Sequence, residues 1–499
     1  MNYRGDFING KFIPVESKDG EFKNTSPGDL NELIMTVPYS FKHIEQAVEA
    51  ARKAFLPWAR LSFDERKVYL LKLKEVFDQN KTQWADVISR DTGKPTWEAL
   101  TEATALSSKI DITINYSIKL IQEERISNAL PSVDGMIRYK PRGVMAVLGP
   151  FNFPAHLPNG HIIPALASGN TVVFKPSEQT PGVAQFMAEC YEKAGFPPGV
   201  FNMVQGEGET GRKLVIHESI DGILFTGSYE VGLKIKAETM NHYWKILALE
   251  MGGKNATVVW DDTDMDKAIY ESLVGSYMTA GQRCSCTSRI LVHEKISEKF
   301  TDRFYQAAKR LTIGHWNENP FMGPLITAAS VEKYIRFQEI ANRENCEMLM
   351  RGKKLELKHK GHYVTPSIHL VKQYDPNSVY QKSEIFGPNV AIYTVNDFDQ
   401  TLNIVNSTGF GLVMALFTKN KSLYEKSLLE AKVGMVNWNR TTNGASSKLP
   451  FGGMGKSGND RASAHFAIQY CTVPVASLED GTDFDINKIL PGIPADSLK

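Results

Sequence analysis

The sequence predicts an α/β protein built around a doubly wound parallel sheet, followed by a second α/β domain. Between Val144 and Val259, short apolar runs alternate with segments that carry helix signals, as in parallel sheets with crossover helices. The chain has 499 residues, 42% of them hydrophobic and 23% charged, which is typical of a globular protein. Because one hydrophobic core rarely serves so long a chain, two or three domains are expected.

Six runs are expected to form the strands of this series. They span residues 144–148, 171–174, 201–204, 222–225, 245–249 and 257–260. The segments between them carry helix signals: Pro181 follows Thr180 at one start, and Gly195 precedes Pro197 and Pro198 at one end.

A second series predicts the second α/β domain. It comprises a helix over 264–279, a strand over 289–292 and helices over 297–311 and 331–345. The polar, alternating tract at 126–139 is expected to form a hairpin that projects from the body. We expect it to pair with the tail at 472–477.

Charge, hydropathy and cysteine content narrow the class of partner. The 57 basic and 56 acidic residues leave a formal net charge of +1, so no overall field attracts nucleic acid or an anionic membrane. The apolar stretches are shorter than the roughly 20 residues of a membrane span, and the N-terminus lacks a secretion signal. Five thinly spread cysteines favour a reducing compartment. We therefore expect a cytoplasmic protein that binds a small molecule.

Cys284 is the first candidate for chemistry. Gly281 is expected to end the preceding helix, and Arg283 places a cation beside the thiol, which favours the nucleophilic thiolate. A lone cysteine is, however, more often a buried packing residue. Cys284 and Cys286 also form a Cys-x-Cys pair, but no second pair or histidine cluster completes a tetrahedral set, so no metal is expected.

Glu250 and Asn152 follow two of the predicted strands. Glu250 ends an apolar run before Gly252, where partial burial would raise its pKa toward that of a useful general base. A capping or ion-paired glutamate is the alternative. Asn152 lies where ligands meet the carboxyl ends of parallel strands, and it is either a turn former or a donor to an oxyanion.

Two strand-to-turn segments indicate a cofactor site. One runs from Lys175 to Glu178, and the other contains Gly227 and Gly232 around the start of a helix, where free amides can receive a pyrophosphate. The spacing is not Gly-x-Gly-x-x-Gly, and most glycine pairs are only turns. Lys175 and Glu178 can equally be surface residues.

Taken in their order along the chain, these stretches resemble the aldehyde dehydrogenase superfamily over nearly the whole chain. The individual motifs are modest, but the ordered set is highly specific. The motifs are Phe-Asn-Phe-Pro at 151–154, Lys-Pro-Ser-Glu at 175–178, Phe-Thr-Gly-Ser at 225–228, Leu-Glu-Met-Gly-Gly at 249–253, Gly-Gln-Arg-Cys at 281–284, Glu-Ile-Phe-Gly-Pro at 384–388 and Pro-Phe-Gly-Gly at 450–453.

The resemblance implies an aldehyde dehydrogenase-like fold in three parts. They are a Rossmann-type NAD-binding domain over 1–125 and 140–253, an α/β catalytic domain over 254–445 and a β oligomerisation flap over 126–139 and 465–490. It also implies NAD-dependent oxidation of an aldehyde to a carboxylate, in a homodimer or homotetramer.

The resemblance further implies a role for each matching position. Cys284 would form a thioester, Glu250 would activate the hydrolytic water, and Asn152 would complete an oxyanion hole with the Cys284 amide. A carboxylate such as Glu178 suits the free 2′-hydroxyl of NAD and opposes a 2′-phosphate. The implied cofactor set is Lys175 and Glu178 for the adenosine ribose, Gly227, Ser228 and Gly232 for the pyrophosphate, and Glu384 and Phe386 for the nicotinamide ribose and ring.

Within the family, residues 149–161 and 436–447 look most like members that act on N-succinylglutamate 5-semialdehyde, the alternative being glutamate 5-semialdehyde. In the latter group a serine after the nucleophile and a Gly-Ala pair bind the α-carboxylate. These positions match Ser285, Gly444 and Ala445. Arg440 and His156 are candidates for a distal carboxylate.

The sequence departs from the family pattern at one position, and two rival functions stay open. Many family members have a glutamate after the arginine that matches Arg461, but Ala462 stands here, so a proton-relay role does not transfer. A CoA-acylating dehydrogenase is one rival, although such relatives usually lack the glutamate at 250. A binding protein without turnover is the other, but it need not retain Cys284, Glu250 and Asn152 together.

Overall fold

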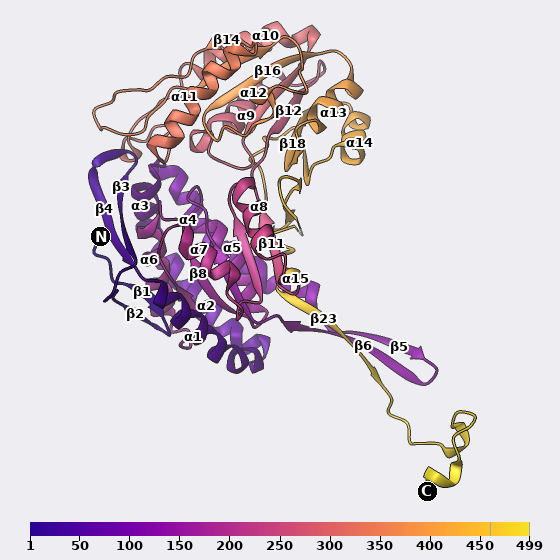
Figure 1. Ribbon diagram of the computed structural model, residues 1–499. Coiled ribbons are helices and arrows are strands. Elements are labelled where there is room, and N and C mark those ends of the chain that lie inside the picture. The colour runs from indigo at the N-terminus through magenta and orange to yellow at the C-terminus, as the bar shows by residue number, and fades with distance from the viewer. Residues whose placement is uncertain (460, 499) are drawn as a thin grey trace.

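The computed structural model describes residues 1–459 and 461–498, and within them two seven-stranded sheets form the body of the molecule (Figure 1). We call the first sheet with helices α1–α8 the first lobe, and the second sheet with α9–α14 the second lobe. A three-stranded arm projects from the first lobe, with the C-terminal tail beyond it (Figure 1).

The first sheet has the order β11-β10-β7-β8-β9-β1-β2, in which five strands run parallel and β1 and β2 add an antiparallel edge. Its strands are β1 (Asp6–Ile8), β2 (Lys11–Ile13), β7 (Val144–Leu148), β8 (Thr171–Lys175), β9 (Phe201–Met203), β10 (Gly222–Thr226) and β11 (Ile246–Glu250). The predicted parallel sheet is confirmed for five of the six runs.

The sixth run of that series belongs to the other sheet. It forms β12 (Asn255–Val259), which pairs in parallel with β13 and β18, so its place among the first six strands was wrong. The physical reason is the turn at Gly252 and Gly253, which carries the chain from one lobe into the other. Hydrophobic periodicity does not reveal this change of sheet, because the strands of both sheets are equally apolar.

The second sheet has the order β14-β15-β16-β13-β12-β18-β19, with β14 antiparallel at one edge. Its other strands are β13 (Thr287–His293), β14 (Glu347–Met350), β15 (Ser367–Val371), β16 (Asn389–Val395), β18 (Val413–Phe417) and β19 (Met435–Trp438). The predicted strand at 289–292 lies inside β13.

Helices cover both sheets. In the first lobe they are α1 (Phe41–Arg60), α2 (Phe63–Gln79), α3 (Lys81–Thr92), α4 (Thr96–Asn115), α5 (His156–Ala167), α6 (Pro181–Ala194), α7 (Gly208–Ile216) and α8 (Tyr229–Glu238). In the second lobe they are α9 (Met265–Tyr277), α10 (Glu294–Ala308), α11 (Ala328–Arg343), α12 (Val379–Lys382), α13 (Phe398–Asn406) and α14 (Lys421–Glu430). The three helices predicted for the second domain are confirmed within a few residues at each end.

Shorter elements complete the chain. The hairpin β3 (Gly20–Ser26) and β4 (Asp29–Tyr39) precedes α1. Near the site lie β17 (Phe410–Gly411), β20 (Pro450–Phe451), β21 (Met454–Gly455), β22 (Ser463–Ala464) and α15 (Ala467–Tyr470). The 3-10 turns are η1 (Ser117–Ile121), η2 (Met278–Gly281), η3 (Trp316–Glu318), η4 (Ile486–Lys488) and η5 (Ala495–Leu498).

The arm consists of β5 (Glu124–Leu130), β6 (Val133–Pro141) and β23 (Thr472–Glu479). Strand β23 pairs antiparallel with β6 over its whole length, from Thr472 opposite Pro141 to Glu479 opposite Asp134. The predicted pairing of a hairpin with the tail is therefore confirmed. In Figure 1 the arm extends well away from both lobes.

Strands of the first sheet are apolar throughout because both of their faces are covered. In β7, Met145 and Val147 join one core cluster, whereas Val144, Ala146 and Leu148 join the cluster on the opposite face. Such a run reads as continuously hydrophobic rather than alternating, which is the signature of a parallel sheet buried between helices.

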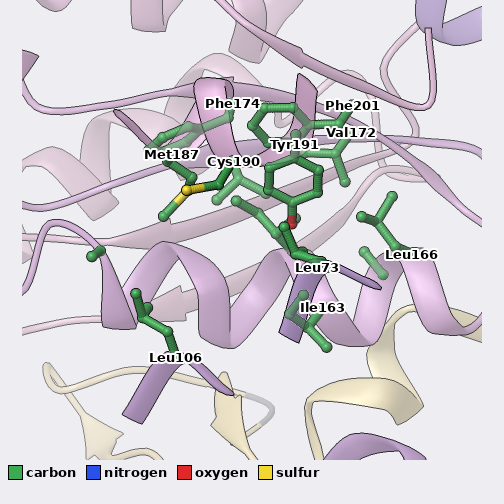
Figure 2. Close-up of a cluster of buried hydrophobic side chains, with 14 of the residues drawn as sticks. Leu73, Leu106, Ile163, Leu166, Val172, Phe174, Met187, Cys190, Tyr191 and Phe201 are labelled. Carbon is green, nitrogen blue, oxygen red and sulfur yellow. The ribbon is translucent and has the colours of Figure 1, made fainter. Parts of the chain in front are cut away.

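Figure 2 shows the larger of these clusters, where α5 and α6 pack on the sheet. The ring of Tyr191 on α6 stacks on Phe201 of β9, with ring centroids 3.8 Å apart and planes 7° apart. Leu166 and Ile163 of α5 and Phe174 of β8 are completely buried beside them. Close packing here holds the sheet, whose carboxyl ends carry the candidate site residues.

None of the helices within residues 1–459 and 461–498 is long and apolar enough to cross a membrane. All five cysteines are free, so a reducing compartment stays a prediction. The described residues contain no group of three or more His, Cys, Asp or Glu side chains that could hold a metal ion.

Replacing Leu166 with Ala should lower the free energy of unfolding by about 2–5 kcal/mol, because it leaves a cavity in this core. Urea denaturation measures the change. The matched control is Leu429→Ala, at a side chain that is 86% exposed, which should change stability by less than about 0.5 kcal/mol. Equal losses in the two variants would contradict the assignment of this core.

Candidate active site

A cavity of about 1400 Å³ lies where the carboxyl ends of the first sheet face the second lobe. Residues that follow β7, β8, β10 and β11 line one side, and the segments around Cys284 and Glu384 line the other. Ligands bind at this edge of open parallel sheets because the loops there diverge and leave a crevice.

The cavity gathers most of the residues predicted for chemistry and for the cofactor. Those that line it are Asn152, Lys175, Glu178, Gly227, Ser228, Cys284, Glu384 and Phe386. Those that do not are Glu250, Gly232, Ser285, Gly444 and Ala445.

The turn before Cys284 has an unusual backbone. Helix α9 ends at Tyr277, and Thr279 and Ala280 then adopt positive φ angles of 57° and 52°. Gly281 follows at φ 71°, and a Cβ there would lie 2.2 Å from the carbonyl oxygen of Gly387. Gly281 was expected to end the helix, but the helix stops earlier because the left-handed turn breaks it. Gly281 instead lets the nucleophile's turn pass close to the segment after Phe386.

The Cys284 thiol is not activated by its neighbour in this state. Burial, with Glu250 and Glu384 nearby, raises the pKa of Cys284 well above its usual range. The predicted effect of Arg283, which lowers the pKa of the thiol, is present but is outweighed here. The guanidinium of Arg283 pairs with the buried carboxylate of Glu98 at 2.8 Å, and its lowering effect on the thiol is the weakest of those acting. The thiol needs a base.

Glu250 ends β11 and is completely buried. Neither of its carboxyl oxygens has a hydrogen-bond partner among the described residues. Burial raises the pKa of Glu250 well above its usual range, and Arg461 opposes that rise only in part. The predicted direction of the shift is confirmed, and the carboxyl group caps nothing in this structure. Since an unpartnered buried carboxyl group is costly, its presence indicates a role other than stability.

A chain of hydrogen bonds lies beside Glu250. Thr226 is its register partner in the parallel pair β10–β11, so the two side chains share one face of the sheet. The ring of His161 contacts the Thr226 hydroxyl at 3.1 Å and the Tyr470 hydroxyl at 2.7 Å. Tyr470 donates to the carbonyl oxygen of Ala462, the position at which the sequence departs from the expected family pattern. The sequence analysis missed His161 and Tyr470, and only the departure at Ala462 pointed to this region.

Asn152 connects the two lobes at the site. Its side-chain nitrogen, buried after β7, donates to the carbonyl oxygen of Gln282 at 2.9 Å. The Phe151 ring beside it packs edge-on against Phe386, with centroids 5.8 Å apart. An amide donor on the turn before Cys284 is consistent with the predicted oxyanion donor, and that role stays a prediction.

The end of the cavity at β8 carries a buried cation and a carboxylate. Lys175 contacts Glu178 at 3.2 Å, and burial lowers the pKa of Lys175 against the opposing effect of that carboxylate. Both residues line the cavity, so the alternative that they are ordinary surface residues does not fit.

The two glycines around α8 have backbone amides that are already bonded. The amide of Gly227 donates to the Glu250 carbonyl oxygen and that of Gly232 to the Ser228 carbonyl oxygen, both at 3.0 Å. The physical reason is position, since Gly227 continues the β10–β11 pairing and Gly232 lies inside the helix. Binding of a pyrophosphate at the turn between them stays a prediction.

Gly232 is also required by packing. A Cβ at Gly232 would lie 2.3 Å from the sulfur of Met251, the residue after Glu250. Ser228 caps α8 by accepting from the Val231 amide at 3.3 Å, so the start of α8 with its positive dipole end faces the cavity.

Glu384 lies against the turn that joins the lobes. It accepts from the Gly253 amide at 2.8 Å, and a Cβ at Gly252 would lie 2.0 Å from its carboxyl group. Burial raises the pKa of Glu384 to about 7. Gly252 thus leaves room for a carboxyl group between Glu250 and Cys284.

The predicted substrate residues lie on two segments that meet, because Ser285 follows the nucleophile and Gly444 and Ala445 belong to the loop after β19. Ser285 donates to the side-chain oxygen of Asn443 at 2.8 Å, and Asn443 in turn donates to the Gly275 carbonyl oxygen at 3.0 Å. The Gly444 amide donates to the carbonyl oxygen of Thr441 at 3.3 Å. Two of the three predicted carboxylate donors therefore already have acceptors. The sequence analysis missed Asn443, although an Asn-Gly pair signals a turn.

The two candidates for a distal carboxylate differ in setting. Arg440 is exposed next to this loop. His156 has a buried ring nitrogen with no hydrogen-bond partner among the described residues, and burial lowers its pKa to about 4. At neutral pH the His156 ring therefore carries no charge.

Comparison with known proteins agrees with this geometry. Residues 14–475 match the aldehyde dehydrogenase family. The chain belongs to the aldehyde dehydrogenase family. The resemblance predicted from the seven ordered motifs is thus confirmed, and so is the fold class.

Several relatives of this aldehyde dehydrogenase share the same name. N-succinylglutamate 5-semialdehyde dehydrogenase of Acinetobacter baylyi is 41% identical over 500 residues, which cover 99% of this chain and 100% of that protein. The protein of the same name from Escherichia coli K12 is 38% identical over 476 residues, covering 95% of each chain.

Solved structures share the fold closely. The 1-pyrroline-5-carboxylate dehydrogenase from Thermus with bound NAD has a TM-score of 0.90 at 30% identity, covering 96% of this chain and 93% of that one. The NAD-dependent aldehyde dehydrogenase from Sinorhizobium meliloti has a TM-score of 0.92 at 28% identity, covering 97% and 96%.

The catalytic rate of this dehydrogenase should rise with pH above neutrality. Both Cys284 and Glu250 have raised pKa values, so both start protonated and must lose a proton to act as nucleophile and base. A plot of kcat/KM against pH should climb by up to about tenfold per unit where one such proton is lost.

The variant Glu250→Gln tests whether Glu250 helps to raise the pKa of the Cys284 thiol. Once Glu250 has lost its proton, its negative charge opposes ionisation of the Cys284 thiol, so the pKa of that thiol should fall in this variant. The pH dependence of alkylation by iodoacetamide measures that pKa directly. Identical alkylation profiles for wild type and variant would contradict the coupling.

Proposed function

We propose that this chain oxidises an aldehyde to a carboxylate with NAD through a thioester on Cys284. The observation that carries this proposal is the meeting of three groups from different segments. A thiol and an amide donor line the cavity, and an unpartnered buried carboxyl group lies close enough to raise the pKa of the thiol. They are the nucleophile, oxyanion donor and base that acyl chemistry requires.

In the proposed reaction the chain's own groups act in order. The Cys284 thiolate attacks the aldehyde carbon, and the resulting oxyanion accepts hydrogen bonds from Asn152 and the Cys284 amide. One such donor is worth about 2.7–4 kcal/mol of transition-state stabilisation. Collapse of the oxyanion releases the aldehyde hydrogen as hydride and leaves the thioester on Cys284. Glu250 then takes a proton from water as that water attacks the thioester carbonyl, and the Cys284 sulfur leaves as thiolate. Bound NAD supplies the hydride acceptor that no side chain can provide.

Several features of the cavity fit NAD. The paired Lys175 and Glu178 suit a ribose at one end, and the capped start of α8 suits a pyrophosphate. At the other end, the space that a Cβ at Gly252 would fill receives Glu384, which with Phe386 would position the nicotinamide ribose and ring. Two related structures also support this cofactor, one by its bound NAD and one by its name.

NAD should be preferred to NADP, since Glu178 would face the added phosphate. We expect kcat/KM for NAD to exceed that for NADP by at least about tenfold, and Glu178→Gln to narrow the ratio. Glu192→Gln is the control, because Glu192 pairs with Arg4 and does not line the cavity. Equal efficiency with both cofactors in the wild type would exclude this placement.

We propose N-succinylglutamate 5-semialdehyde as the substrate. The names of relatives that are 38–41% identical over nearly the full length support it. An α-carboxylate leaving water needs donors, and Ser285 and the loop at Gly444 and Ala445 lie beside the nucleophile. Arg440 is the candidate for the succinyl carboxylate. Glutamate 5-semialdehyde is the alternative, supported by the structural likeness to the Thermus enzyme.

A substrate panel tests this choice. The kcat/KM should be highest for succinylglutamate semialdehyde, compared with glutamate semialdehyde, succinate semialdehyde and an uncharged alkyl aldehyde. Ser285→Ala should lower the first value by about tenfold and spare the alkyl aldehyde, as expected for one hydrogen bond to a charged group. Ser288→Ala is the control, since that hydroxyl donates to Asn255 instead. Equal losses on both substrates would remove the support for carboxylate recognition.

The CoA-acylating rival predicts a different product. NADH production would then require added CoA. Glu250 here instead favours water as the group that attacks the thioester. If turnover depends on CoA, the hydrolytic proposal fails.

We further propose the domain division and assembly that the family resemblance implies. Residues 1–125 and 140–253 would bind NAD, 254–445 would carry the nucleophile, and 126–139 with 465–490 would join subunits in a homodimer or homotetramer. The arm exposes Ile126, Leu130 and Leu478 by 46%, 49% and 61%. Exposed apolar side chains on a projecting sheet suit a symmetric contact. A cytoplasmic location is proposed from the free cysteines.

A further inference from the structure

Two buried acids on one helix contact both halves of the site. Glu98 and Glu102 lie one turn apart on α4 and are 0% and 2% exposed. Residues four apart on a helix project from the same face, so the two carboxylates point in one direction. Neither acid lines the cavity.

Glu98 holds the turn that leads to the nucleophile. Its carboxylate accepts from the guanidinium of Arg283 at 2.8 Å and also from the Thr279 hydroxyl. The same hydroxyl accepts from Arg283 at 2.6 Å. Because Thr279 is one of the two left-handed residues, Glu98 stabilises the unusual turn itself as well as the residue before Cys284.

Glu102 holds the segment that carries the oxyanion donor. One of its oxygens accepts from the amides of Ala155 and His156, at 3.0 and 3.1 Å. Its other oxygen accepts from Lys94 at 2.6 Å, a lysine that is itself buried. These bonds fix the backbone within a few residues of Asn152, at the start of α5.

The side chain of Phe153 lies between the two ion pairs. The ammonium of Lys94 is 3.7 Å from the centre of its ring, and the guanidinium of Arg283 is 4.8 Å from it. A cation over an aromatic face is attracted to the ring. The residue after Asn152 is therefore held by two cations, each of which is paired with an acid of α4.

Buried ion pairs of this kind add little net stability, because desolvation offsets their attraction. They do fix geometry, since a buried charge cannot leave its partner without a large penalty. Asn152 comes from the first lobe and Cys284 from the chain leading into the second sheet, so their spacing must be set by contacts between those segments. Helix α4 supplies such contacts to both.

We propose that Glu98 and Glu102 are positioning residues that set the distance between the oxyanion donor Asn152 and the nucleophile Cys284. The inference rests on the proposed function of those two residues. Displacing a catalytic group by about 1 Å can cost about 10²-fold in rate. Loss of either acid should thus impair oxyanion stabilisation more than it impairs the thiol.

The test compares two reactions of the same thiol in Glu98→Gln. Attack on the aldehyde forms an oxyanion, whereas alkylation by iodoacetamide does not. The rate of the first NADH turnover, measured by stopped flow, should fall about 10–10²-fold. Alkylation should be unchanged or faster, because Arg283 without its acid favours the thiolate. Glu102→Gln should likewise slow the first NADH turnover without slowing alkylation. This variant replaces Glu98→Gln in the test if Glu98→Gln does not fold.

Asp91→Asn is the matched control. Asp91 is also completely buried, and it accepts from the Val183 amide at the start of α6, away from the cavity. This variant should lower the melting temperature and leave the ratio of the two rates unchanged. An equal fall of both rates in Glu98→Gln, or the same split in Asp91→Asn, would overturn the inference.

Combining Glu98→Gln with Asn152→Ala tests whether Glu98 acts through Asn152. If Glu98 acts through Asn152, Glu98→Gln should add little to the loss already caused by Asn152→Ala. Additive losses would overturn the inference. Full turnover by Cys284→Ala would refute the proposed function instead, so the two failures are distinguishable.

Discussion

The hydrogen bond from Asn152 to the Gln282 carbonyl oxygen is the contact on which the site depends. It joins the loop after β7 to the turn before Cys284, so it crosses between the lobes. Each partner is held in turn by its own lobe, the first by the start of α5 and the second by the left-handed turn after α9. The proposed oxyanion hole would therefore form only when both lobes are folded and docked.

Burial is the second constraint, because it raises the pKa of three acid groups near the nucleophile. The pKa values of Cys284, Glu250 and Glu384 are all raised by burial. A dry site strengthens hydrogen bonds to a developing oxyanion, and it also makes ionisation of thiol and carboxyl groups expensive. The same low dielectric thus favours oxyanion stabilisation and requires a base close to the thiol. Glu250, the proposed base for the hydrolytic water, is buried without a partner at a cost in stability, as is common at functional sites.

Small residues decide which groups can meet at this edge of the sheet. Gly252 leaves room for the carboxyl group of Glu384, and Gly232 leaves room for the sulfur of Met251. Gly281 lets the nucleophile's turn pass Gly387. In each case the missing side chain serves close packing between segments that are distant in sequence, which a motif read locally as a phosphate-binding turn does not reveal.

The sequence by itself determined the parallel sheet, the helices of the second lobe, the pairing of the hairpin with the tail and the family. Local hydrophobic periodicity and an ordered set of motifs are enough for these, because strands buried on both faces must be apolar. It also named Cys284, Glu250 and Asn152, since each follows a strand or turn with a recognisable pattern. Only the tertiary structure decided that Arg283 neutralises Glu98 rather than activating the thiol, that the amide of Gly232 is already bonded, and that β12 crosses to the other sheet. The physical reason is that burial, charge pairing and close packing depend on residues brought together from distant parts of the chain, and no local pattern records those distances.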